Sequence, residues 1–174
     1  VDEVSRDSPA PGGGSVAALS GALGAALGTM VANLSTSKAG FEKLKAKLSD
    51  ISSKGQNTKN KLIKAIDDDT SAFDEVIKAM RMPKDTEEEK KLRNKKMQEG
   101  YKIATLVPLE TVENCKEALY ICKDISQIMD ESMASDVGSG ALMANAGAIS
   151  AAYNVRINLK SITDKSFSST TTNK

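Results

Sequence analysis

An aspartate in the middle of an apolar helical stripe is the residue of this sequence best suited to acid–base chemistry. Apolar side chains recur every three or four residues from Leu62 to Met80, and the same alternating step places Asp69 among them. A buried carboxylate is costly unless it is paired or hydrogen-bonded, so such groups are retained for specificity or catalysis more often than for stability. Its neighbours Asp67 and Asp68 are also polar, so periodicity alone allows equally a stripe that opens to water at this point.

A glycine-rich loop, PAPGGGS from Pro9 to Ser15, is the second candidate site. Glycines expose backbone N–H groups, and a helix with Ser15 as its N-cap would add partial positive charge, so the loop could bind an anion or a carbonyl oxygen. The loop lacks the Lys-Ser/Thr pair of a nucleotide-binding P-loop and the strand–turn–helix setting of a dinucleotide fingerprint. Taken alone, it is more simply interpreted as a flexible entry to a helix.

Two further polar groups have simpler interpretations. Ser135 and Asp136 precede a stretch of small residues, and either side chain could cap a helix there. The lysines and glutamates from Lys84 to Lys102 are typical of a solvated helix face with pairs four residues apart.

Histidine is absent from the sequence. Its absence removes the commonest general base, the commonest metal ligand and every Ser–His arrangement, so proton transfer falls to Asp, Glu, Lys, Tyr or Cys. Cys115 and Cys122 lie two helical turns apart, too far for a disulfide along one helix, and are predicted to be core-facing thiols in a reducing compartment. The net charge of +1 gives no field that would attract nucleic acid.

The elements that position these residues are predicted to be helices throughout. Hydrophobic residues make up 40% of the chain but aromatic residues only 3%, which suits helix-on-helix packing, and no segment alternates with the period of a strand. The 174 residues suffice for an all-α, single-domain bundle of about five to seven helices. The predicted helices span residues 16–34, 41–80, 86–104, 109–122, 125–133 and 138–162.

Prolines and polar runs set the predicted boundaries of these helices. Pro83 ends the second helix, Thr86 and Glu89 form a capping box for the third, and Pro108 kinks or restarts it. Residues 1–14 are predicted to be a lead-in with the glycine loop, 15–165 the helical domain, and 166–174 a disordered tail rich in Ser, Thr and Asn.

Two uncharged stretches, residues 16–34 and 137–155, require a membrane span to be considered. The first is long enough to cross a bilayer, and Gly24 and Gly28 make a GxxxG pair. Both stretches consist mainly of Ala, Gly and Ser, so their transfer into lipid is weakly favoured, and a matched pair is better explained as the close-packed centre of a bundle. No basic segment followed by an apolar core begins the chain, and we therefore expect a soluble, cytoplasmic protein.

Five segments that contain these features occur in the order found in one known family. They are PAPGGGSVAALSGALGAALGTMVANL, LIKAIDDDTSAF, AMRMPKDTEEEKKLR, LVPLETVENC and SDVGSGALMANAGAISAAYNVRINLKSITD. They cover almost the whole chain from Ser8 to Asp164 and resemble the C-terminal domain of formiminotransferase-cyclodeaminase, which is shared with bacterial methenyltetrahydrofolate cyclohydrolases. The middle segment is more similar to the animal-type cyclodeaminase.

The resemblance implies a homodimer or higher oligomer that binds a tetrahydrofolate derivative between helices, without a metal or redox cofactor. The implied lyase reaction closes formiminotetrahydrofolate to methenyltetrahydrofolate with release of ammonia, downstream of histidine breakdown, and a formiminotransferase is an implied partner. Asp69 is the expected acid/base, with Asp67 shaping its environment. By motif position the resemblance assigns folate binding to Gly12, Gly13, Gly14, Ser15, Lys84, Asp136, Asn154 and Asn158.

Two alternatives remain at this point. The same pocket could hydrolyse methenyltetrahydrofolate, with water as the nucleophile, as a cyclohydrolase does. The chain could also be a non-catalytic helical dimerisation module.

Overall fold

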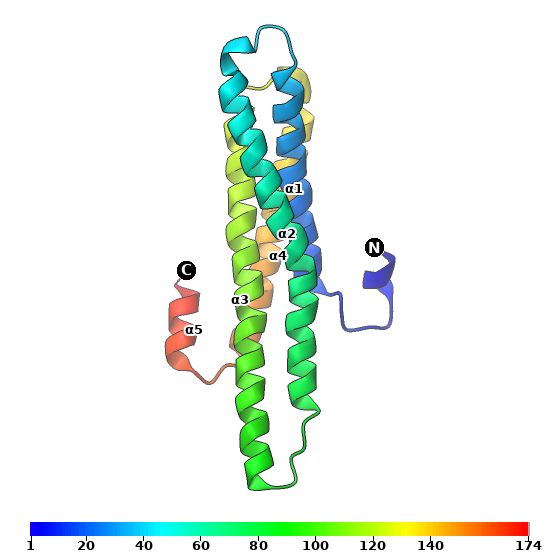
Figure 1. Cartoon of the computed structure of the whole chain (residues 1–174), viewed down its shortest axis with the longest axis vertical. Coiled ribbons are helices and arrows are strands. Elements are labelled where there is room, and N and C mark those ends of the chain that lie inside the picture. The colour runs from blue at the N-terminus through cyan, green and yellow to red at the C-terminus, as the bar shows by residue number, and fades with distance from the viewer. Residues whose placement is uncertain (174) are drawn as a thin grey trace.

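The computed structural model describes residues 1–173 as four long helices packed along one axis (Figure 1). They are α1 (Gly13–Thr36), α2 (Lys45–Met80), α3 (Glu87–Ser126) and α4 (Ala134–Leu159). A shorter α5 (Lys165–Thr172) lies beside α3, and short 3-10 turns occur at Asp2–Ser5, Glu42–Leu44 and Glu131–Met133. The described residues contain no strand, so the predicted all-α, single-domain bundle is confirmed.

The third helix differs from its prediction because Pro108 does not interrupt it. α3 runs continuously through Pro108, where three shorter helices were expected between residues 86 and 133. Proline removes one helical hydrogen bond, here the bond to the Ala104 carbonyl four residues earlier. The Nδ2 group of Asn158 on α4 donates to that carbonyl at 2.6 Å, so a neighbouring helix satisfies the group that Pro108 leaves without its partner. The predicted capping box of Thr86 is confirmed.

The disordered tail predicted for residues 166–174 is wrong over its described part, which forms α5. Asp164 caps this helix by accepting from the Phe167 amide at 3.0 Å. Lys102 of α3 donates to the Asp164 carboxylate at 2.7 Å, and its ammonium group lies 5.3 Å from the centre of the Phe167 ring. A cap and a tether to α3 therefore order a segment whose composition alone predicts disorder. Lys174 lies outside the described residues.

Small residues bring the backbones of α1 and α4 into direct contact. A Cβ atom on Gly24 would lie 2.6 Å from the Gly140 carbonyl oxygen, and one on Gly147 would lie 2.7 Å from the Ala17 carbonyl oxygen. By length and composition alone α1 could cross a membrane, but 61% of its most apolar window is buried inside the bundle. Such burial is typical of the central helix of a bundle, as the composition predicts.

We predict that Gly24→Ala lowers the free energy of unfolding by about 1–3 kcal/mol, because backbone atoms of α4 cannot move aside cheaply. The matched control is Gly138→Ala on α4, where a Cβ would meet nothing within 4 Å. That substitution should leave stability unchanged or raise it by ~0.5–1 kcal/mol through helix propensity. Urea unfolding of both variants measures the difference, and equal effects would contradict the close contact.

The two cysteines are free and buried in the core, as predicted. Burial raises the pKa of each thiol, Cys115 and Cys122, to about 11. The protonated thiols therefore contribute fully to the free energy of unfolding at a pH below the pKa of an unfolded thiol. This contribution is lost as the pH rises toward and through 11. We predict that iodoacetamide alkylates both thiols slowly in the folded protein at mildly alkaline pH and rapidly in urea. Mass spectrometry measures the extent of alkylation. Rapid alkylation without urea would contradict the prediction, because it would show that the thiols are accessible in the folded protein.

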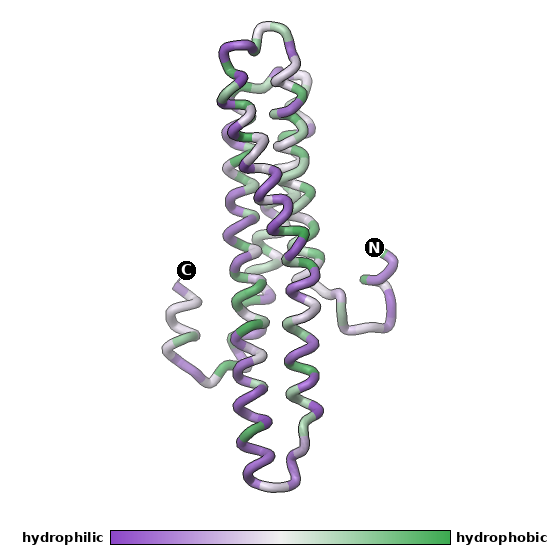
Figure 2. The backbone as a smooth tube through the Cα atoms, in the orientation of Figure 1, coloured by the Kyte–Doolittle hydropathy of each residue, from purple (hydrophilic) through white to green (hydrophobic). Residues whose placement is uncertain are grey.

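The helices differ in length, so α2 and α3 continue past the start of α1 and the end of α4 (Figure 1). The start of α1 is level with Asp69 of α2, to which Ser15 hydrogen-bonds. The chain that follows α4 is level with Gln98 of α3, which donates to the Ser161 carbonyl. We call residues 73–98, which project beyond these points, the α2–α3 arm. Most residues along its backbone are hydrophilic (Figure 2). The arm meets the four-helix section at the candidate site.

Candidate functional site

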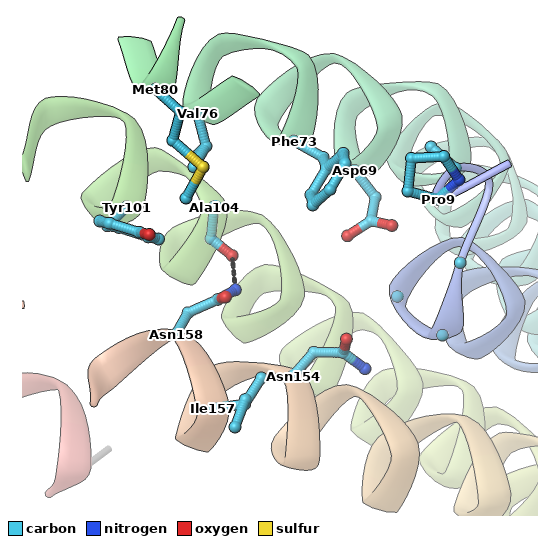
Figure 3. Close-up of a pocket in the computed structure, with 14 residues that line it drawn as sticks. Pro9, Asp69, Phe73, Val76, Met80, Tyr101, Ala104, Asn154, Ile157 and Asn158 are labelled. Carbon is cyan, nitrogen blue, oxygen red and sulfur yellow. Dashed lines mark hydrogen bonds between the residues drawn. The ribbon is translucent and has the colours of Figure 1, made fainter. Parts of the chain in front are cut away.

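A cavity of about 340 Å³ opens at the start of α1, between α2, α3 and α4 (Figure 3). One end is polar, and the other is apolar and reaches the α2–α3 arm. The polar end is lined by Pro9, Ala10, Gly12, Gly13, Gly14, Asp69 and Asn154, and the rest by Phe73, Val76, Met80, Tyr101, Ala104, Ile157 and Asn158. Among these lining residues, all of them described, Asp69 is the only Asp, Glu, Lys or Arg.

Asp69 is half-buried in α2 and is held by a serine from α1. The Ser15 hydroxyl donates to Asp69 Oδ2 at 2.9 Å, and Ser15 itself is buried. The expectation that Ser15 is the N-cap of α1 is wrong, because the helix begins at Gly13 with Gly12 as its cap. Ser15 therefore lies in the first turn, where its side chain can reach across to α2. The apolar stripe of α2 does include a carboxylate, and that carboxylate has a hydrogen-bond donor.

Gly14 lets the Asp69 carboxylate approach the backbone of α1. A Cβ atom at position 14 would lie 2.1 Å from Asp69 Oδ1 and 2.5 Å from its Cγ. The first turn of a helix has N–H groups without helical partners and carries partial positive charge. The Asp69 side chain therefore occupies the place beside the glycine loop where an anion or a carbonyl oxygen could bind.

Two asparagines of α4 form the side of the cavity opposite α2. Asn154 Nδ2 donates to the Ser150 carbonyl at 2.9 Å, and Asn158 Nδ2 donates to the Ala104 carbonyl at 2.6 Å. These bonds fix both carboxamides by their nitrogens, so each Oδ1 is an acceptor at the cavity. Figure 3 shows the Asn154 carboxamide and the Asp69 carboxylate on opposite sides of the same space. The polar end of the cavity therefore offers acceptors for a ligand that donates hydrogen bonds.

Three residues predicted for the site lie away from this cavity. Asp67 is exposed, because residues two positions apart do not share a helix face. Lys84 is exposed in the turn at the end of the α2–α3 arm. Asp136 lies in the first turn of α4, roughly 27 Å of helix rise before Asn154.

Tyr101 is a lining residue that the sequence analysis did not identify. It lies within the charged segment from Lys84 to Lys102, which predicts a solvated face, yet it is half-buried at the apolar end of the cavity. The signal available was the pair Gly100–Tyr101, which interrupts the run of charges. Gly100 is buried against Val76, and its small size lets α2 and α3 approach one another beside the cavity.

Comparison with known proteins gives consistent matches over the whole chain. A family model described as formiminotransferase-cyclodeaminase matches residues 1–174. A methenyltetrahydrofolate cyclohydrolase of Methylorubrum extorquens is 39% identical over 167 residues, which are 96% of this chain and 80% of that relative. A formimidoyltransferase-cyclodeaminase of Sus scrofa is 36% identical over 96% of this chain but only 31% of its own length.

The fold also matches a solved structure. The crystal structure of a formiminotetrahydrofolate cyclodeaminase from Thermotoga maritima superposes with a TM-score of 0.88 at 28% sequence identity. The match covers 99% of this chain and 82% of that one. Sequence and structure comparisons therefore agree on one group of relatives.

Proposed function

Because this chain belongs to the formiminotransferase-cyclodeaminase family, whose matched members are named as folate cyclodeaminases and cyclohydrolases, we propose that it is a formiminotetrahydrofolate cyclodeaminase. The reaction closes formiminotetrahydrofolate to methenyltetrahydrofolate and releases ammonia. The observation that carries the proposal is the Asp69 carboxylate, held by Ser15 at the polar end of a cavity that has no cationic lining residue among those described.

The substrate presents the positive charge that this cavity lacks. Its formimino group is an amidinium, a planar cation with N–H donors, and a carboxylate binds such a group by charge-assisted hydrogen bonds. The Oδ1 atom of Asn154 supplies a further acceptor on the opposite side. The fixed orientation of these groups supports catalysis by positioning, which lowers the barrier to ring closure.

In the proposed mechanism, Asp69 transfers one proton within the substrate. N10 of the folate forms a bond to the amidine carbon, which becomes tetrahedral, and N10 then loses its proton to the Asp69 carboxylate. Asp69 delivers this proton to the terminal amino group, and the C–N bond to that group breaks as ammonia leaves. The remaining N5–C–N10 bridge keeps the positive charge as the methenyl product, so charge and protons balance without an external reagent. The proposal assigns no metal or redox cofactor, since the folate is itself the substrate.

The second candidate is a methenyltetrahydrofolate cyclohydrolase, favoured by the relative of that name, of which this chain covers 80%. Its substrate is also a cation, so the same carboxylate would hold it and activate a water molecule. Parallel assays of the purified chain distinguish the two functions. Ammonia release from formiminotetrahydrofolate, faster than hydration of the methenyl compound, is expected. The reverse order would favour the cyclohydrolase, and neither activity together with no folate binding would favour a non-catalytic module.

We also propose that the chain forms a homodimer through an apolar face of α1. This α1 face consists of half-exposed side chains spaced three, four or seven residues apart, namely Val16, Leu19, Leu23, Met30 and Leu34. Exposed apolar patches of this extent mark interaction surfaces. Sedimentation should give a dimer for the wild type and a monomer for Leu23→Glu, while Ile63→Glu on α2, equally exposed, should remain dimeric. A monomeric wild type at micromolar concentration would contradict the proposal.

The cellular context is proposed from the relatives. The Sus scrofa relative is about three times as long as this chain and is named for a formimidoyltransferase as well, so a transferase is the proposed partner. The cytoplasm is the proposed compartment. Co-purification of a transferase with the chain would test the partnership.

A further inference from the structure

The direction in which a folate lies in the cavity can be inferred from how charge is distributed along it. A reduced folate has a pterin ring, a one-carbon bridge, a benzoyl ring and an anionic glutamate tail, in that order. The cavity runs along α2 from Asp69 to Met80, a helix rise of about 16 Å. Figure 3 shows Asp69 at one end and Met80 with Tyr101 at the other.

The glycine-loop end is unsuited to the anionic tail. The start of α1 would ordinarily attract an anion, but Asp69 already lies against Gly14 there. A second carboxylate at this place would be repelled by the first. The one-carbon group, which is cationic, fits beside Asp69, and the tail must then extend toward the α2–α3 arm.

The apolar part of the cavity, beyond Asp69, is suited to an aromatic ring. Phe73 and Tyr101 contribute aromatic surface from α2 and α3, and Ile157 contributes aliphatic surface from α4. An aromatic ligand gains both burial and ring-to-ring contacts in such surroundings. The benzoyl ring therefore has apolar surroundings on the side of the reacting atoms that faces the arm.

Beyond Met80 lies a guanidinium group that has no acidic partner among the described residues. Arg93 is half-buried and lies outside the cavity lining, but its Nε–H donates to the carbonyl of Met80, a residue that does line the apolar end, at 3.2 Å. Its neighbours along α3 are neutralised within the helix, Lys90 by Glu87 and Lys96 by Glu99. The Nη groups of Arg93 remain available for a carboxylate, which they can bind in a bidentate manner.

We infer that Arg93 binds the glutamate tail of the substrate and that Tyr101 positions the benzoyl ring, an inference that rests on the proposed function. In this arrangement the pterin and the one-carbon group lie at the glycine loop, and the tail leaves along the α2–α3 arm. Further glutamates on the tail would extend past Arg93 into solvent.

Calorimetry with two ligands tests the arrangement: tetrahydrofolate, and tetrahydropteroate, which lacks the glutamate. Arg93→Gln retains a side-chain donor for the Met80 carbonyl but removes the charge. It should weaken tetrahydrofolate binding about ten-fold, the effect of one charged hydrogen-bonded contact, and leave tetrahydropteroate binding unchanged. Tyr101→Leu should weaken both ligands. Lys54→Gln, on the exposed surface of α2 and paired with Asp50, is the control and should affect neither.

The outcomes separate this inference from the proposed function. Equal effects of Arg93→Gln on both ligands, or no effect on either, would overturn the tail assignment even if the wild type turns over formiminotetrahydrofolate. Equal affinity of the wild type for tetrahydrofolate and tetrahydropteroate would also overturn the tail assignment. Unchanged binding of both ligands to Tyr101→Leu would overturn the ring assignment. A wild type that binds neither ligand would overturn the proposed function together with this inference.

Discussion

Asp69→Asn is expected to lower the rate of ammonia release by about 10²- to 10⁴-fold, the usual cost of losing a positioned general base. Asparagine keeps the size of the side chain and an oxygen that can accept from the Ser15 hydroxyl, so packing and the link to α1 persist. What is lost is the charge that binds the amidinium and the group that carries the proton. Removing a half-buried charge should leave the melting temperature unchanged or raise it.

The matched control is Asp68→Asn, one residue earlier, whose carboxylate is paired with Lys64 on the surface of α2. The Asp68→Asn variant should keep full turnover. Its melting temperature should also change little, because an exposed pair of this kind contributes only ~0–1 kcal/mol to stability. A structural role for Asp69 makes the opposite prediction, with a lower melting temperature and little change in turnover per folded molecule. Near-normal ammonia release by a well-folded Asp69→Asn protein would reject Asp69 as the base.

Gly14→Ala is expected to lower turnover about 100-fold while the protein stays folded, because the new methyl group displaces the carboxylate that we propose as the acid/base. The added Cβ would lie 2.1 Å from Asp69 Oδ1, so the Asp69 side chain must rotate away from the first turn of α1. A displacement of about 1 Å at a reacting group can cost 10²-fold in rate. Stability should change little, because alanine is favoured over glycine inside a helix and because only the Asp69 side chain, and no backbone atom, has to move.

Turnover and melting temperature of Gly14→Ala should be compared with those of Gly138→Ala, which adds the same methyl group to α4 in open space. A loss of turnover in the first variant alone would support a positional requirement at Asp69. Full activity in Gly14→Ala would mean that the carboxylate need not approach α1, and the proposed geometry of the site would be wrong.

Much of the fold could be predicted from composition and periodicity. Small residues in two uncharged stretches predict close backbone contact, and Gly24 against Gly140 has it. The end of α2 before Pro83 and the capping box at Thr86 follow from local chemistry. Such features depend on residues that are close together in the sequence, so the sequence alone is enough to predict them.

Features that depend on a second helix could not be predicted. Pro108 alone favours a kink, and only the position of Asn158 on α4 explains why α3 continues. The core phase of Asp69 follows from its own helix, but its donor Ser15 comes from α1, where a serine after glycines favours a capping role. Tyr101 belongs to a charged segment and lines the cavity because α2 packs closely on Gly100.

The unequal lengths of the four helices give the two ends of the cavity different freedom to fluctuate. Asp69 and the glycine loop stand where all four helices pack, whereas the α2–α3 arm is flanked by fewer neighbours and should open at a lower free-energy cost. A ligand that binds along the arm restricts this motion, and the lost conformational entropy reduces its affinity. With the proposed chemistry at Asp69, substitutions in the arm are expected to alter KM by making that segment stiffer or looser and to leave kcat unchanged. Substrate affinity and chemical rate are thereby free to evolve separately within one small bundle.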